Sequence, residues 1–94
     1  MKINGFKIGF KVVTFPPGRP VNITVHWSDT SARTLRAAKI QCRKQMSGNI
    51  RDAILMIGVI DEYNLGPFVV SVAGNNPGSS WSDYEGTKVY DMIV

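Results

Sequence analysis

The first part of the chain alternates between apolar and polar positions with a period of two, in two runs separated by residues 16–20 (PPGRP). The apolar members are Phe6, Ile8, Phe10 and Val12 in the first run and Val21, Ile23, Val25 and Trp27 in the second. Such alternation predicts two half-buried strands, and the short proline-rich link predicts a hairpin. Gly5 and Gly9 weaken the first strand, and we expect them to mark a bulge.

A helical pattern follows the hairpin. The segment 27–32 (WSDTSA) is rich in residues that cap helix N-termini, so Asp29 or Thr30 is the predicted cap, and the helix should run to about Met46. At 100° per residue one stripe is apolar and should pack on the sheet. The members of this stripe are Ala32, Leu35, Ala38, Cys42 and Met46.

The rest of the chain returns to strand patterns. Residues 53–63 (AILMIGVIDEY) predict a central strand buried on both faces, although a short helix beginning near Asn49 is an alternative for 50–57. A turn at 64–67, a strand over 68–72, a long loop over 74–86 and a last strand over 87–94 complete the order. The prediction is an α+β fold in one compact domain, residues 1–94. It has a single antiparallel sheet of about five strands, ordered ββαβββ, with one amphipathic helix packed on one face.

Charge is distributed unevenly along the chain. Residues 1–51 carry ten basic side chains and one acidic one, whereas residues 52–94 carry six acidic side chains and one basic one. Whether the two halves form separate surfaces is left open by the sequence. The N-terminus lacks a signal-peptide pattern, and the longest apolar run, 53–60, is far shorter than the ~20 residues of a membrane span. We expect a cytoplasmic protein without a membrane partner.

The residues that could support catalysis are few. His26 is the only histidine and alternates away from the apolar side, so we expect it at the surface; Cys42, the only cysteine, is expected to be a buried packing thiol. The acidic pairs Asp61/Glu62 and Asp83/Glu85 are typical of solvated edges. The loop 74–86 lacks the lysine of a phosphate-binding loop. We therefore expect no enzyme, no cofactor and no metal.

The helix has a basic side that no nearby acid neutralises. A partner-binding surface is predicted here, made of Arg33, Arg36, Ile40, Arg43 and Lys44, with Trp81 and Tyr84 of the long loop as a second contact. Three interpretations compete: a merely solvated face, a sequence-nonspecific DNA or RNA contact, and a protein interface. An apolar residue amid arginines is typical of protein interfaces, so Ile40 favours the third. Association of the chain with itself also fits the two charged halves.

In size and general character the chain resembles small proteins encoded by phages and mobile elements, anti-CRISPR proteins among them. That resemblance rests on no motif, and it implies a non-catalytic inhibitor that occludes a surface of a nucleic-acid-handling complex. On this hypothesis, replacing Arg36 and Arg43 with glutamate abolishes binding and leaves the fold intact.

Overall fold

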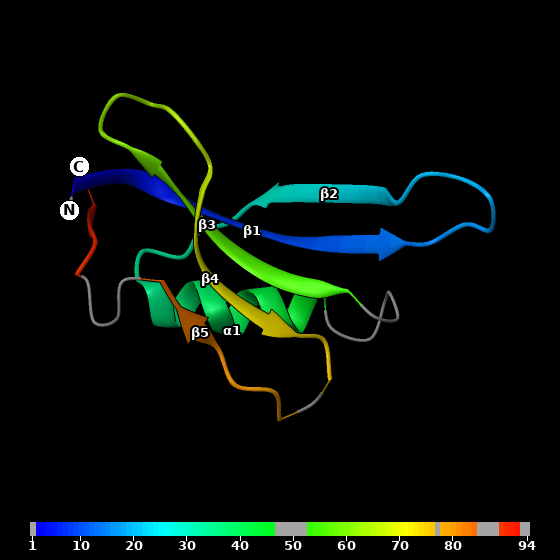
Figure 1. The fold of residues 1–94 in the computed structure, drawn as a ribbon. Coiled ribbons are helices and arrows are strands. Elements are labelled where there is room, and N and C mark those ends of the chain that lie inside the picture. Colours follow the sequence, from blue (N-terminus) through cyan, green and yellow to red (C-terminus); the bar gives the residue numbers. More distant parts are fainter. Residues whose placement is uncertain (1, 47–52, 77, 85–88, 93–94) are drawn as a thin grey trace.

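The chain folds into one sheet with a single helix on one face (Figure 1). The computed structural model describes residues 2–46, 53–76, 78–84 and 89–92. The elements are β1 (Lys2–Thr14), β2 (Asn22–Asp29), α1 (Leu35–Met46), β3 (Ile54–Asp61), β4 (Phe68–Gly74), β5 (Ser82–Asp83) and β6 (Asp91–Met92). The strand order is β2-β1-β3-β4-β5 with antiparallel neighbours, and the short β6 pairs with β1 in parallel. The predicted α+β fold and its element order are confirmed.

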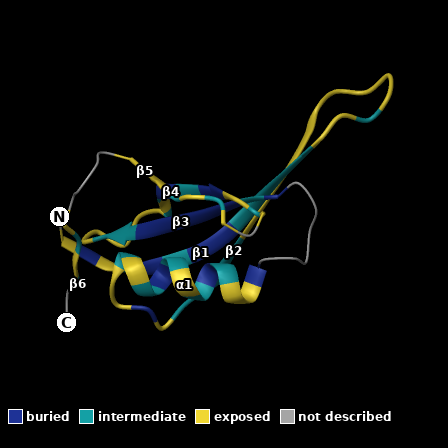
Figure 2. Cartoon of the chain, turned by 90° about the horizontal axis from the view of Figure 1, so that it is seen from below, coloured by how far each residue is buried: buried dark blue, intermediate teal, exposed yellow. Residues whose placement is uncertain are grey.

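The predicted hairpin is present as β1 and β2. Its register runs from the Lys7–Asp29 pair at one end to the Thr14–Asn22 pair at the other. The distal half of the hairpin extends well past the helix-covered body, and its residues are largely exposed (Figure 2). This shape follows from the unequal strand lengths, because β1 is longer than the β3 strand on its other side.

The register places the apolar positions of the two strands on opposite faces of the sheet. Phe10 pairs with His26 and Ile8 pairs with Ser28, so the helix-facing side of β1 lies beside the polar side of β2. The apolar side of β2 therefore faces away from α1, and Ile23 remains 59% exposed. The alternating pattern predicted that β2 is a strand. Which of its two faces points toward α1 depends on its register with β1.

The helix begins later than predicted. β2 continues to Asp29, where the carboxylate forms an ion pair with Lys7, so neither Asp29 nor Thr30 caps the helix. Thr34 is the cap instead: its hydroxyl accepts the amide of Ala37 at 3.1 Å, and its carbonyl accepts the amide of Ala38 at 3.0 Å. Arg33 consequently precedes the helix. The helix is described up to Met46, and its predicted end there is not tested because 47–52 lie outside the described residues.

The apolar stripe of the helix packs on the sheet as predicted. Ala38, Cys42 and Met46 are buried, with Leu35 partly buried and Ala32 buried just before the helix. They meet a sheet surface made of Ile3, Phe6, Ile8, Leu55, Ile57, Val59 and Val70. The expected burial of Cys42 is confirmed, and its thiol donates to the carbonyls of Gly9 and Met56 at 3.6 and 3.8 Å.

The central strand β3 lies between β1 and β4 and is buried from Leu55 to Val59. The strand alternative holds from Ile54 onward, while 50–52 are outside the described residues. A bulge between Ile3 and Gly5 confirms the expectation for Gly5. Gly9 forms no bulge.

Instead, Gly9 and Gly58 leave a flat area on the sheet face opposite α1 on which the indole ring of Trp27 lies. This area, formed by Gly9 and Gly58, is called the Trp27 seat. A Cβ built on Gly9 would lie 2.7 Å from Cε3 of Trp27, and one built on Gly58 would lie 2.9 Å from its Cη2. Two neighbouring strands thus lack side chains where the Trp27 ring crosses them.

The C-terminal part departs from prediction in one respect. The loop expected over 74–86 contains β5, which pairs with β4 through Ser71–Asp83 and Val72–Ser82. The strand expected over 87–94 is seen only as β6, since 89–90 are described outside any strand and 87–88 and 93–94 lie outside the described residues. No helix in the described part of the chain has the length and apolar character needed to cross a membrane.

Candidate binding surface

The outward side of α1 carries two rows of residues with different surroundings. Lys39 and Arg43, one turn apart, lean toward β5 and the loop before it, where both are engaged. Arg36, Ile40 and Lys44 form the next row, and all three are exposed. The spacing of three and four residues explains why each row shares one line along the helix.

Arg43 holds the loop between β4 and β5 against the helix. Its guanidinium donates to the carbonyls of Gly74 at 3.3 Å, Asn76 at 3.4 Å and Ser79. The same group lies over the Trp81 ring, 5.5 Å from the centroid. A planar group with five donors suits several carbonyls at once, so the primary role of Arg43 is to order this loop.

Lys39 ties the helix to β5. Its ammonium lies 2.8 Å from a carboxylate oxygen of Asp83, and the Ser71 hydroxyl donates to the same carboxylate at 2.6 Å. These contacts, with the bond from Lys39 the larger influence, hold the pKa of Asp83 below its usual range. Lys39 is not among the predicted surface residues, because the helix pattern does not reveal the pairing of β5 with β4 that brings Asp83 to it.

A shallow hollow of about 380 Å³ joins the two predicted contacts into one surface. It is lined by Arg36, Lys39, Ile40, Arg43 and Trp81. Ile40 is 60% exposed in this setting, although its aliphatic side chain would normally be buried. Among the described residues, Arg36 and Lys44 make no ion pair, so two free cations flank an apolar centre.

Two predicted site residues lie outside the hollow. Arg33 is exposed in the segment before α1 and does not belong to the helical face. Tyr84 follows β5, where its amide donates to the carbonyl of Val70 at 2.8 Å and its ring is about half exposed. The structure therefore brings together Arg36, Ile40, Arg43 and Trp81 from the predicted set, with Lys44 on the adjoining turn of the helix.

The two charged halves of the sequence are in contact rather than apart at this surface. The Lys39–Asp83 ion pair and the bonds from Arg43 to the loop both connect the basic half with the second half. About half of the positive charge of α1 is thus engaged within the molecule.

The other residues considered for chemistry have structural contacts. His26 is exposed as predicted, stacks beside Phe10 with ring centroids 5.3 Å apart, and lies 3.0 Å from the Ser28 hydroxyl. Asp61 accepts the amides of Tyr63 and Leu65 and closes the turn after β3. Within the described ranges, no cluster of three His, Cys, Asp or Glu side chains could hold a metal.

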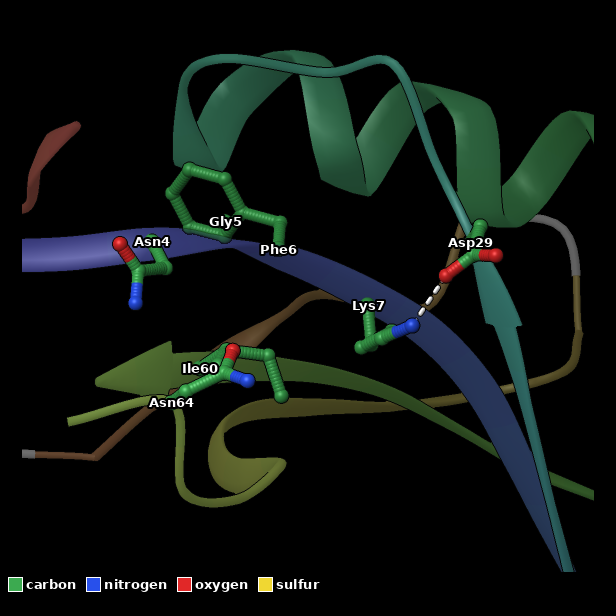
Figure 3. Close-up of a pocket in the computed structure, with 7 residues that line it drawn as sticks. All are labelled: Asn4, Gly5, Phe6, Lys7, Asp29, Ile60 and Asn64. Carbon is green, nitrogen blue, oxygen red and sulfur yellow. Dashed lines mark hydrogen bonds and ion pairs between the residues drawn. The ribbon is translucent and has the colours of Figure 1, made fainter. Parts of the chain in front are cut away.

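A second hollow, of about 370 Å³, lies on the sheet face opposite α1 (Figure 3). It is lined by Asn4, Gly5, Phe6, Lys7, Asp29, Ile60 and Asn64. The Phe6 ring turns toward the helix, whereas the Asn4 amide points to the other side of the sheet (Figure 3). The Lys7–Asp29 ion pair closes one end, so the cation and the anion of this hollow satisfy each other.

Comparison with known proteins gives no match: no family model fits the chain, and no curated protein or solved structure is significantly similar to it.

Proposed function

We propose that this chain is a non-catalytic binding protein that acts by covering a surface of a protein partner with the outer side of α1. The observation that carries the proposal is Ile40, an exposed aliphatic side chain that lines a hollow together with Arg36, Lys39, Arg43 and Trp81. An apolar centre with a cationic rim fits an acidic partner surface that presents an apolar side chain.

The partner class in this proposal is a nucleic-acid-handling complex, whose acidic or phosphate-binding sites a small inhibitor of the phage type would occlude. Ordering of the site supports such use. Arg43 and Lys39 hold the loop and β5 against α1, so Trp81 needs little reorganisation before it makes contact.

Direct nucleic-acid binding is the competing function for the same face. Arg36 and Lys44 on this face, with Arg33 in the segment before the helix, are the cations not engaged by described residues, and three phosphate contacts imply a salt slope of about −2.7 for duplex DNA. Affinity would then fall roughly fortyfold between 50 and 200 mM salt. The exposure of Ile40 among these cations favours protein, because phosphates gain nothing from an aliphatic side chain.

Fluorescence anisotropy with four labelled probes tests the proposal: duplex DNA, single-stranded DNA, RNA, and an acidic peptide with a central leucine between glutamates. We expect the peptide to bind, and Ile40→Glu and the double variant Arg36→Glu/Lys44→Glu to abolish that binding. The double variant replaces the Arg36/Arg43 pair, because reversing Arg43 would also release the loop. If the nucleic acids bind with a steep salt dependence and the peptide does not bind, the proposal is wrong and this surface is a nucleic-acid-binding site.

A further inference from the structure

The sheet face opposite α1, here called the open face, carries many apolar side chains although the described structure places no layer over it; its charged members include Lys11 and the Lys7–Asp29 ion pair. The strand register shows which residues belong to this face. Trp27, Gly9 and Met56 are cross-strand neighbours on β2, β1 and β3, and Val25, Lys11 and Ile54 are the next such set. The aliphatic and aromatic members are Val13, Ile23, Val25, Trp27, Ile54, Met56, Ile60, Val69 and Val72. A solvated face of an antiparallel sheet is normally polar, and a continuous apolar surface marks a contact site.

One end of the open face is the protruding part of the hairpin, residues 11–25, here called the arm. It carries Lys11 and Arg19 and no acidic residue. Phe15, Val21 and Ile23 are exposed on it, and it extends beyond the body (Figure 2). A two-stranded hairpin on its own is marginally stable in water, so a basic arm with exposed apolar residues is well suited to packing on another surface.

The other end of the open face has the opposite charge. The turn between β3 and β4, residues 61–67, carries Asp61 and Glu62 and no basic residue. Tyr63 and Leu65 are exposed on it. The turn rises on the side of the sheet away from α1 (Figure 1). The molecule thus offers a basic apolar arm at one end of this face and an acidic apolar turn at the other.

The arm and the turn lie in opposite directions along the strands from the Trp27 seat. Four residues separate Gly9 from Val13 toward the arm, and four separate Gly58 from Glu62 in the opposite direction, about 13 Å of strand in each case. A two-fold axis that lies in the interface above the seat, parallel to the sheet and perpendicular to the strands, would lay the arm of each copy over the turn of the other.

We propose that a second copy of this chain covers the open face, in a two-fold symmetric dimer in which sheet stacks on sheet and each basic arm packs on the acidic turn of the other copy. Such an interface uses the same patch on both subunits and closes on itself. A standard interface buries about 800 Å² per partner, which is about an eighth of the 6206 Å² surface of the chain. The outer side of α1 stays free for its own partner.

Sedimentation equilibrium from low micromolar to about 1 mM protein tests the dimer, with a matched pair of variants. Ile23 and Ile40 are equally exposed, 59% and 60%, but lie on opposite sides of the molecule. Ile23→Lys should weaken dimerisation about tenfold or more because it places a charge in the stacked interface, and Ile40→Lys should leave it unchanged. A wild-type chain that is monomeric throughout this range, or equal weakening by both variants, overturns the proposal.

A charge exchange tests the orientation of the two copies. Lys11→Glu and Glu62→Lys should each weaken dimerisation about threefold to tenfold, because each places like charges together. The double variant Lys11→Glu/Glu62→Lys should restore the affinity, since the pair is then reversed in both copies. If the double variant is weaker than either single one, the arm does not meet the turn and the proposed arrangement is wrong.

Discussion

At the scale of single residues, Gly9 matters because a larger side chain at this position would clash with its neighbours. In Gly9→Ala the new Cβ would lie 2.3 Å from the carbonyl oxygen of His26 and 2.7 Å from Trp27. The first neighbour is backbone and cannot turn away, so the strands must shift. We expect the free energy of unfolding, measured by urea denaturation, to fall by about 1–3 kcal/mol.

Gly5→Ala is the control for this prediction. It lies on the same strand, but a Cβ there meets nothing within 4 Å. The variant should be as stable as the wild type or more stable by up to about 1 kcal/mol, because alanine restricts the unfolded chain. Equal stability of Gly9→Ala and Gly5→Ala would show that the Trp27 seat tolerates a methyl group.

Cys42 provides a second residue-scale prediction. Its side chain is fully buried, and burial raises the pKa of the thiol, so the reactive thiolate is scarce as well as covered. In the native protein at pH 8, an aromatic disulfide reagent should modify Cys42 only as fast as the chain opens. In urea the same thiol should react within the mixing time. Rapid native modification would mean that α1 separates from the sheet easily.

These residues show what can be predicted from local pattern. The 3.6-residue periodicity sufficed to place Cys42 in the core, because the helix repeats its apolar side within one segment. Gly9 could not be understood that way. Its neighbours Trp27 and Gly58 come from two other strands, and only the register identifies them.

At the scale of elements, Arg43 connects α1 to the loop before β5. Arg43→Lys keeps the charge but loses the planar donors that reach three carbonyls, so we expect amide hydrogen exchange over residues 74–81 to accelerate about tenfold, a local cost near 1.4 kcal/mol. Lys44→Ala, at the exposed neighbouring position, should leave exchange there unchanged. Unaltered protection in Arg43→Lys would show that the loop orders itself without the guanidinium.

The Lys39–Asp83 contact makes the docking of β5 dependent on pH. The pKa of Asp83 is lowered in the folded state, so the contact stabilises the protein fully above the ordinary aspartate pKa of about 3.9. The contribution is lost as pH falls below that value through the lower, folded pKa. Because both groups are partly exposed, it should not exceed about 1 kcal/mol.

Asp83→Asn tests the assignment. Its unfolding free energy should be lower than that of the wild type at pH 6, and the difference should shrink as the pH approaches 2. A difference that is constant between pH 6 and pH 2 would mean that the charge of Asp83 is irrelevant and only its hydrogen bond to Ser71 matters.

The α+β class and the ββαβββ order followed from the sequence, whereas the short strand β5, the helix start and the membership of the binding surface did not. Asp29, Thr30, Ser31 and Thr34 are all acceptable caps, and the pairing of Lys7 with Asp29 decides among them by extending β2. The correction removes Arg33 from the helical face. Similarly, Arg43 looks free on a helical projection, and its engagement depends on a loop 31 residues away.

At the scale of the whole molecule, the unequal charge of the two halves has two structural outcomes. On the helix side, basic residues from the first half of the sequence contact residues from the second half. Residues of both halves line one hollow together with Ile40. Besides the Lys7–Asp29 ion pair, the open face has a basic arm at one end and an acidic turn at the other. One molecule therefore has an ordered partner-binding side and a separate side suited to a second copy.

The arm allows a direct test of this division of the molecule. Residues 14–22 can be replaced by Asn-Gly, which connects the paired Val13 and Ile23 through a two-residue turn. Because that segment is exposed and lies beyond the helix-covered body, we expect the shortened chain to unfold cooperatively in urea, with a free energy within about 1 kcal/mol of the wild type. It should bind the acidic peptide as before and dimerise more weakly, since the outer part of the arm, with Phe15, Arg19 and Val21, is gone. A shortened chain that loses its cooperative unfolding would show instead that the arm belongs to the folding unit. A shortened chain that dimerises as tightly as the wild type would show that stacking of the sheets alone holds the two copies together.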